Sequence, residues 1–175
     1  HYTGMKSGPD ALARMQDTND PRVSAHYMVE EDGRVFALVP EDKRAWQAGR
    51  SWWRGDEDLN SRSIGIEIVN GGHDFGLPPF PDVQIEAVIA LCQGILGRWA
   101  IPPERIVAHS DIAPDRKEDP GERFPWKRLA EAGIGLWPQH ARPEPWMTHG
   151  AALGDAGMTV EGLQRDLAAI GYRIL

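Results

Sequence analysis

The longest periodic stretch of the chain runs from Asp82 to Trp99, where apolar residues recur at intervals of three and four positions. This spacing places them on one broad face of a helix. They are Val83, Ala87, Val88, Leu91, Cys92, Ile95 and Trp99. Prolines at positions 102 and 103 stop the pattern. We therefore predict one long amphipathic helix over residues 82–99.

Two other stretches have the patterns of strands. Residues 23–30 alternate with a period of two, Asp32-Gly33 is a hairpin dipeptide, and residues 35–39 are a second apolar run. Together they predict a β-hairpin. Residues 63–69 read Ser-Ile-Gly-Ile-Glu-Ile-Val, a nearly continuous β-branched run that is typical of a strand buried on both faces.

Strand and helix patterns alternate along the rest of residues 1–138. Short helices are predicted at 10–15 and 124–132, and Arg105-Ile106-Val107-Ala108 predicts a buried strand that ends at His109. The alternation, with a hairpin near the front, predicts an α/β domain. We expect a mixed central β-sheet flanked by helices on both faces.

The pattern changes after residue 138. Residues 139–158 are interpreted as a linker, and an apolar stripe in residues 159–175 predicts a helix that Gly171 ends. The stripe consists of Val160, Leu163, Leu167 and Ile170. One helix is too little for a core of its own, so either the chain ends inside a module or the helix packs on residues 1–138.

Composition excludes several classes of function. The chain has 175 residues, 41% of them apolar, and a net charge of −7, without the basic stripe that nucleic-acid binding needs. No apolar run approaches the ~18 residues of a transmembrane segment. The single cysteine, Cys92, rules out an internal disulfide, and its place on the apolar helix face indicates buried packing.

A stiff polar loop follows His109. Residues 110–126 contain three prolines, one glycine and a run of charges that ends in Asp119. An imidazole and a carboxylate on one rigid loop suit a catalytic zinc site, which uses three protein ligands and leaves a position for water. The alternative from spacing alone is a solvated loop whose histidine only caps a neighbouring element.

Two more polar residues interrupt predicted strands. Glu67 lies in the middle of residues 63–69, where a carboxylate is costly unless it is functional or paired with a cation such as Arg62. His26 lies inside the hairpin, where a histidine is more often a hydrogen-bonded structural residue than a ligand.

Tryptophans gather in residues 45–55 without a helix or strand period. They can anchor the loop in the core or offer a surface on which a sugar or peptide stacks. We expect both, with Trp46 packed inside and either Trp52 or Trp53 facing a groove.

The motifs together resemble the amidase-2 type of N-acetylmuramoyl-L-alanine amidases, the AmpD/AmiD group. The similar segments are His1-Tyr2-Thr3, Val23-Ser24-Ala25-His26-Tyr27, Ala48-Gly49-Arg50-Ser51-Trp52, Ser63-Ile64-Gly65-Ile66-Glu67, and His109 with Lys117-Glu118-Asp119-Pro120-Gly121. The likeness covers residues 1–138 in order. It is greatest to the periplasmic AmiD branch, on residues 112–117 and 133–138. Relatives commonly have His where Gln47 stands.

The resemblance implies a zinc hydrolase. His1, His109 and Asp119 would bind Zn²⁺, Glu67 would transfer the proton of water, and Lys117 would stabilise the oxyanion. The implied reaction cleaves the amide between N-acetylmuramic acid, or its anhydro form, and L-alanine of peptidoglycan stem peptides. We also expect substrate contacts from Arg50, Trp52, Trp53 and His26. The alternative is a non-catalytic peptidoglycan-recognition module with the same fold.

The resemblance also implies a location. The helix in residues 159–175 resembles the first helix of a peptidoglycan-binding module, which favours the cell envelope or periplasm over the cytoplasm. In the family an apolar strand leads into the first ligand, so we expect a preceding strand and a leader, which could anchor the protein. Peptidoglycan or muropeptides are the expected partners, and a monomer is the expected state.

Overall fold

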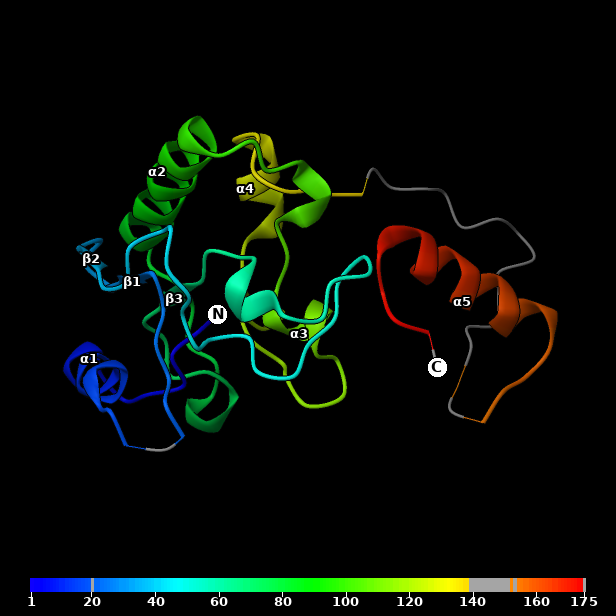
Figure 1. The fold of residues 1–175 in the computed structure, drawn as a ribbon, viewed down its shortest axis with the longest axis horizontal. Helices are drawn as coiled ribbons and strands as arrows, with labels where there is room; N and C mark the ends of the chain where they lie inside the picture. The colour runs from blue at the N-terminus through cyan, green and yellow to red at the C-terminus, as the bar shows by residue number, and fades with distance from the viewer. Residues whose placement is uncertain (20, 139–151, 153, 175) are drawn as a thin grey trace.

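The computed structural model describes residues 1–19, 21–138, 152 and 154–174. In these residues three short strands form one sheet, and helices surround it (Figure 1). The strands are β1 (Tyr27–Val29), β2 (Val35–Ala37) and β3 (Ile66–Ile68). The helices are α1 (Gly8–Gln16), α2 (Asp82–Arg98), α3 (His109–Ile112), α4 (Trp126–Glu131) and α5 (Met158–Ile170), with 3-10 turns at Leu59–Ser61, His73–Phe75 and Pro103–Arg105.

The sheet is mixed and has the order β2-β1-β3. Strands β1 and β2 pair antiparallel, as the hairpin pattern predicted, whereas β1 and β3 are parallel. The first residues of the chain run along the free side of β3, where Tyr2 forms a parallel bridge with Ile68. The amide of Ile68 donates to the carbonyl of His1 at 3.0 Å. His1 is therefore fixed at the sheet by main-chain bonds.

Helices cover both faces of this sheet. Val29 and Ile68 point toward α2, where they pack with other buried residues in one core cluster. Met28 and Val69 point the other way and pack against Ala11 of α1. Figure 1 shows α2 and α1 on opposite sides of the strands. Since successive residues of a strand face opposite sides, the two clusters follow from the strand pattern. The predicted fold class is confirmed.

The long helix is confirmed as α2, but its orientation differs from the prediction at both ends. Val83 is 50% exposed and Trp99, just after the helix, is 43% exposed. The buried face contains the predicted Val88 and Ile95, and also Ile85, which was not predicted. Gln84 is also fully buried, and its amide donates to the carbonyls of Val29 in β1 and of Val69, the residue after β3. Sheet geometry, rather than hydropathy alone, sets the rotation of the helix.

The predicted strand at residues 105–108 is wrong. Residues 103–105 form a 3-10 turn, and no β-ladder includes residues 106–108 within the described part of the chain. Ile106 and Ala108 do have extended backbone angles. A β-branched run favours that conformation, but a strand also needs a neighbour to bond with. His109 consequently opens helix α3 rather than ending a strand.

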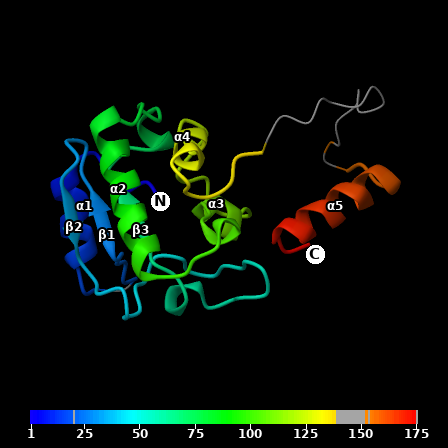
Figure 2. The ribbon, with the colours of Figure 1, turned by 90° about the horizontal axis from the view of Figure 1, so that it is seen from above.

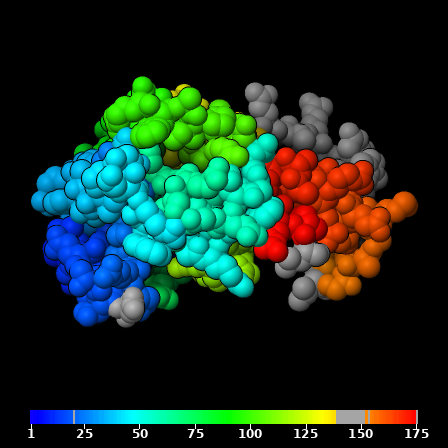
Figure 3. Space-filling model, viewed as in Figure 1, coloured from blue at the N-terminus to red at the C-terminus, as the bar shows by residue number. Residues whose placement is uncertain are grey.

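A helix is present where the C-terminal stripe predicted one, while most of the predicted linker (139–158) lies outside the described residues. Helix α5 has no buried residue, and only its C-terminal end approaches the rest of the molecule (Figures 2 and 3). There the ring of Tyr172 stacks edge-on against Trp53, and its hydroxyl donates to Asp111 of α3. Arg54 donates to the carbonyls of Ile170 and Gly171.

Replacing Tyr172 with Phe tests this contact. The variant keeps the ring on Trp53 but leaves the Asp111 carboxylate without its hydroxyl donor. Because the bond is half-buried and has a charged acceptor, we expect the free energy of unfolding to fall by about 1–2 kcal/mol in urea titrations. Met158→Ala, at the exposed other end of α5, should change it by less than about 0.5 kcal/mol. Equal stability of Tyr172→Phe and the wild type would show that the hydrogen bond to Asp111 contributes nothing.

Candidate metal centre

Three polar side chains from distant parts of the sequence meet beside the sheet. Nδ1 of His1 lies 2.9 Å from Nδ1 of His109 and 2.9 Å from Oδ2 of Asp119. Nδ1 of His109 lies 3.1 Å from the same carboxylate oxygen. Among the described residues, only this group of His, Cys, Asp or Glu has ligand atoms arranged for a shared metal ion.

Main-chain bonds hold each of the three in place. The main-chain nitrogen of His1 donates to the carbonyl of Ile66 in β3 at 3.0 Å. His109 is the first residue of α3. The N-terminus of this helix is capped by Asp111, whose carboxylate accepts from the amide of Ala108 at 2.7 Å. The carbonyl of Asp119 accepts from the amide of Ser110, which ties the loop back to α3.

The electrostatics of the three groups are coupled. Burial would raise the pKa of Asp119, but the close contacts of its Oδ2 with both imidazoles hold this pKa well below its usual range, so the carboxylate stays ionised. Burial lowers the pKa of His109, and the bond to Asp119 offsets this only in part. Burial would also lower the pKa of His1, but the bond to Asp119, the charges of Glu67 and Asp119 and the bond to Gln47 together outweigh it and raise this pKa.

The potential ligand atoms of the three side chains are suited to a metal cation. Nε2 of His109 lies 3.2 Å from the carbonyl of Ala48, which can only accept, so Nε2 carries the proton of the neutral ring. Its Nδ1 then presents a lone pair to Nδ1 of His1 and to the Asp119 carboxylate. A cation satisfies such converging lone pairs, and two imidazoles with one carboxylate form a ligand set that suits zinc.

Glu67 lies next to this centre on β3. It is 8% exposed, and its Oε2 is buried without a hydrogen-bond partner. Burial raises its pKa to about 7, against the opposing field of His1. The alternative of a partner in Arg62 is wrong, because that guanidinium pairs with Asp56 instead. A buried carboxylate that titrates near neutrality and has an unpaired oxygen is suited to proton transfer.

The metal-site cleft is the open pocket next to the three potential ligands and Glu67. It has a volume of about 850 Å³ and is lined by His1, His109, Asp119, Glu67 and Lys117. The structure thus brings together all five residues expected to act in chemistry. The sequence analysis gave no role at this site to other residues that line it, namely Tyr2, Arg14, Arg22, Trp46, His73 and Arg116. They come from separate loops, from the 3-10 turn at His73–Phe75 and from α1, so their meeting in one cleft depends on the fold.

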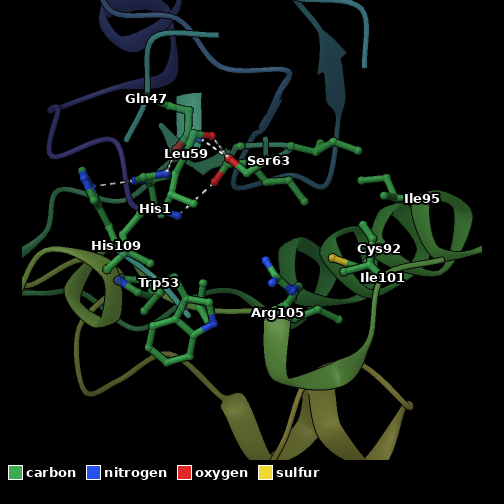
Figure 4. A pocket seen from close by; sticks show the side chains of 18 of the residues that line it. His1, Gln47, Trp53, Leu59, Ser63, Cys92, Ile95, Ile101, Arg105 and His109 are labelled. Carbon is green, nitrogen blue, oxygen red and sulfur yellow. Dashed lines mark hydrogen bonds between the residues drawn. The ribbon is translucent and has the colours of Figure 1, made fainter. Parts of the chain in front are cut away.

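A second cavity lies on the inner side of the two histidines (Figure 4). Its volume is about 290 Å³, and its lining includes Leu59, Cys92, Ile95 and Ile101. The lining is largely apolar and contains no carboxylate. The proton-transfer chemistry therefore belongs to the metal-site cleft. Cys92 packs against the core as expected, and burial raises its pKa to about 11.

The tryptophans exchange their predicted places. Trp46 is 47% exposed and lines the metal-site cleft, so the expectation that it packs inside is wrong. Trp53 is 4% exposed and packs in the core. Trp52 stacks with Arg173, and Arg50 pairs with Asp115 at 2.8 Å. Neither Arg50 nor Trp52 nor Trp53 lines the metal-site cleft, so their predicted substrate contacts stay predictions.

His26 is a structural residue. It is fully buried, its Nδ1 accepts from the amide of Gly65 at 2.9 Å, and its Nε2 donates to the carbonyl of Lys43 at 3.0 Å. Both ring nitrogens are therefore used by the backbone. This geometry corrects the expected substrate contact, because the side chain has no polar atom left for a ligand.

The chain is similar to known amidases. The chain is 44% identical over 154 residues to the N-acetylmuramoyl-L-alanine amidase AmiD of Escherichia coli (strain K12), which covers 81% of this chain and 54% of AmiD. The chain thus spans about half the length of this relative. It is 42% identical over 121 residues to the 1,6-anhydro-N-acetylmuramyl-L-alanine amidase AmpD of Enterobacter cloacae, covering 69% of this chain and 63% of AmpD.

The fold also matches a solved structure of E. coli AmiD in complex with the substrate anhydro-N-acetylmuramic acid-L-Ala-D-γ-Glu-L-Lys. The TM-score is 0.83 at 41% identity, and the match covers 100% of this chain and 70% of that one. The model of the family Amidase_2, described as N-acetylmuramoyl-L-alanine amidase, matches residues 1–122. These residues contain all five side chains of the metal centre and its proton-transfer site, and the chain belongs to the Amidase_2 family.

Proposed function

We propose that this chain is a zinc-dependent N-acetylmuramoyl-L-alanine amidase. It hydrolyses the amide between N-acetylmuramic acid, or its anhydro form, and L-alanine of peptidoglycan stem peptides. One observation carries the proposal: the three converging ligand atoms of His1, His109 and Asp119 share a cleft with the unpaired buried carboxylate of Glu67. A binding module needs no buried carboxylate there, whereas hydrolysis needs a proton acceptor.

The ligands and the metal have separate roles. His1 and His109 would hold zinc through Nδ1, and Asp119 through Oδ2. When bound, zinc supplies Lewis acidity toward a carbonyl oxygen and makes hydroxide available from water near pH 7. Helix α3 and β3 hold these ligands before substrate arrives, which reduces the reorganisation that the reaction requires.

Glu67 and Lys117 carry the charge and proton changes. Glu67 accepts a proton from the attacking water through its free Oε2, and then delivers it to the nitrogen of the departing L-alanine. The amide C–N bond breaks, leaving a carboxylate on the sugar and an amine on the peptide. Lys117 is partly buried in the same cleft and acts on Glu67 electrostatically. Its ammonium stabilises negative charge that develops on the carbonyl oxygen.

Removing the metal tests the proposal. We expect the protein as purified to release L-alanine-terminated peptide from a defined anhydro-muropeptide, and to lose this activity after treatment with a chelator. Stoichiometric zinc should restore it. Binding of the muropeptide without any release of peptide, at every zinc concentration, would instead support the non-catalytic recognition module.

The cellular location follows from the C-terminal region. We propose that residues 159–175 begin a wall-binding module after a catalytic domain at 1–138, which places the enzyme in the cell envelope or periplasm. No helix in the described residues combines the length and apolarity needed to cross a bilayer. Recovery of the protein only in the cytosol after fractionation of cells would defeat this location. The expected monomer stays a prediction, which light scattering checks.

A further inference from the structure

A row of hydrogen bonds leads from the backbone to His1. The hydroxyl of Ser63 donates to the carbonyl of Leu59 at 2.5 Å, and the amide nitrogen of Gln47 donates to that hydroxyl at 2.8 Å. The amide oxygen of Gln47 then lies 2.5 Å from Nε2 of His1. Figure 4 shows Gln47 and Ser63 beside His1, at the edge of the apolar cavity.

The chemistry of these groups fixes the direction of every bond in the row. The carbonyl of Leu59 can only accept, so the one proton of the Ser63 hydroxyl points to it. The hydroxyl oxygen is then left as an acceptor, which the NH₂ end of Gln47 must face. The amide oxygen therefore faces His1, and Nε2 of His1 must donate. The remaining nitrogen, Nδ1, is left as the one that can bind a metal.

The side chain of Gln47 is held firmly enough for this role. It belongs to a residue that is only 8% exposed, and its own backbone amide donates to Oδ1 of Asn60 at 2.9 Å. A Cβ at Gly65 would come within 2.6 Å of Cγ of Gln47, so glycine makes the space that the side chain occupies. The amide thus has little freedom to turn away from His1.

The same short segment braces the second histidine. The next residue, Ala48, accepts from Nε2 of His109 through its carbonyl, and its amide also donates to Oδ1 of Asn60. Residues 47 and 48 therefore bond the outer nitrogens of both imidazoles, and both Nδ1 atoms turn toward Asp119. A partner on the second ring nitrogen fixes the tautomer and orientation of a metal-binding histidine.

We propose that Gln47 is a positioning residue for the metal centre, which sets zinc affinity by accepting the Nε2 proton of His1. The inference rests on the proposed zinc site. Gln47 lines both cavities, but its amide oxygen faces Nε2 of His1 and not the Nδ1 atom that points to Asp119. Its effect reaches the reaction only through the orientation of His1.

Zinc affinity of two variants tests the inference. Gln47→Leu fills similar space but offers no acceptor, and we expect it to bind zinc roughly 10- to 100-fold more weakly in chelator competition. Gln47→Glu keeps an acceptor oxygen and should bind zinc at least as tightly as the wild type. The melting temperatures of the metal-free proteins show whether either variant has lost its fold.

Nuclear magnetic resonance of the zinc-loaded wild type supplies a second readout. The Nε2 proton of His1 should be visible and protected from exchange, and Gln47→Leu should lose that protection even if its fold is weakened. Wild-type zinc affinity in Gln47→Leu, equal losses in Gln47→Leu and Gln47→Glu, or a proton on Nδ1 of His1 would overturn the role of Gln47. Absence of zinc binding in the wild type would instead overturn the proposed function and this inference together.

Discussion

Glu67→Gln will keep one zinc per chain and lose most of its turnover. The amide has nearly the shape of the carboxylate but cannot accept a proton from water. General acid–base groups typically contribute roughly 100- to 10,000-fold in rate, and we expect a loss in that range on a defined muropeptide. Metal analysis and turnover of the same preparation provide the measurement. Loss of zinc would make Glu67 a ligand, and near-normal turnover would remove it from the mechanism.

The pH dependence of turnover carries the signature of the same group. A general base works when ionised, so turnover should rise with pH as Glu67 loses its proton. Burial raises the pKa of Glu67 to about 7 in the metal-free protein, and a nearby cation lowers it. In the zinc enzyme, turnover should therefore increase with pH at values below 7. The residual activity of Glu67→Gln should not increase with pH in this range. If the pH profile of the variant matched that of the wild type, the increase would belong to the ionisation of another group.

His109→Ala will lose its bound zinc. The substitution removes one of the three proposed ligands, the imidazole whose Nδ1 lies 3.1 Å from Oδ2 of Asp119. The wild type should retain one zinc per chain after gel filtration, and the variant close to none. Turnover should disappear with the metal.

His73→Ala is the matched control for this loss. His73 is also a histidine lining the metal-site cleft, but it contacts Tyr2 and Glu122 rather than the three ligands. Its replacement should leave the zinc content unchanged. Equal zinc content in His109→Ala and the wild type would mean that the metal is bound elsewhere.

The sequence predicted the elements whose formation depends mainly on residues that are close together in the chain. The period of three to four in residues 82–99 gave helix α2, and alternation around Asp32-Gly33 gave the β1–β2 hairpin. The strand expected at residues 105–108 failed, because its existence depends on a neighbouring strand and not on its own residues. The predicted burial of Trp46 was wrong for a similar reason, because the burial of the tryptophans depends on contacts with distant residues. Trp53, for example, is buried where Tyr172 stacks on it.

The site divides in a similar way. The loop from His109 to Asp119 was recognisable by residue type, but spacing alone could not bring His1, more than a hundred positions away, to the same point. Family resemblance supplied that link, and the pairing of the first residues with β3 explains it. The role of Gln47 was out of reach, because it depends on the direction of hydrogen bonds. The family resemblance showed only that relatives commonly have a histidine where Gln47 stands.

Hydrolysis in water enriched in the heavy oxygen isotope tests the central claim most directly. The zinc-loaded protein is incubated with a defined anhydro-muropeptide, and both products are weighed by mass spectrometry. Our account predicts one heavy oxygen in the new carboxylate of the muramic acid product, and an unlabelled peptide that begins with L-alanine. Label in the peptide, cleavage at another bond, or an intact substrate would contradict it.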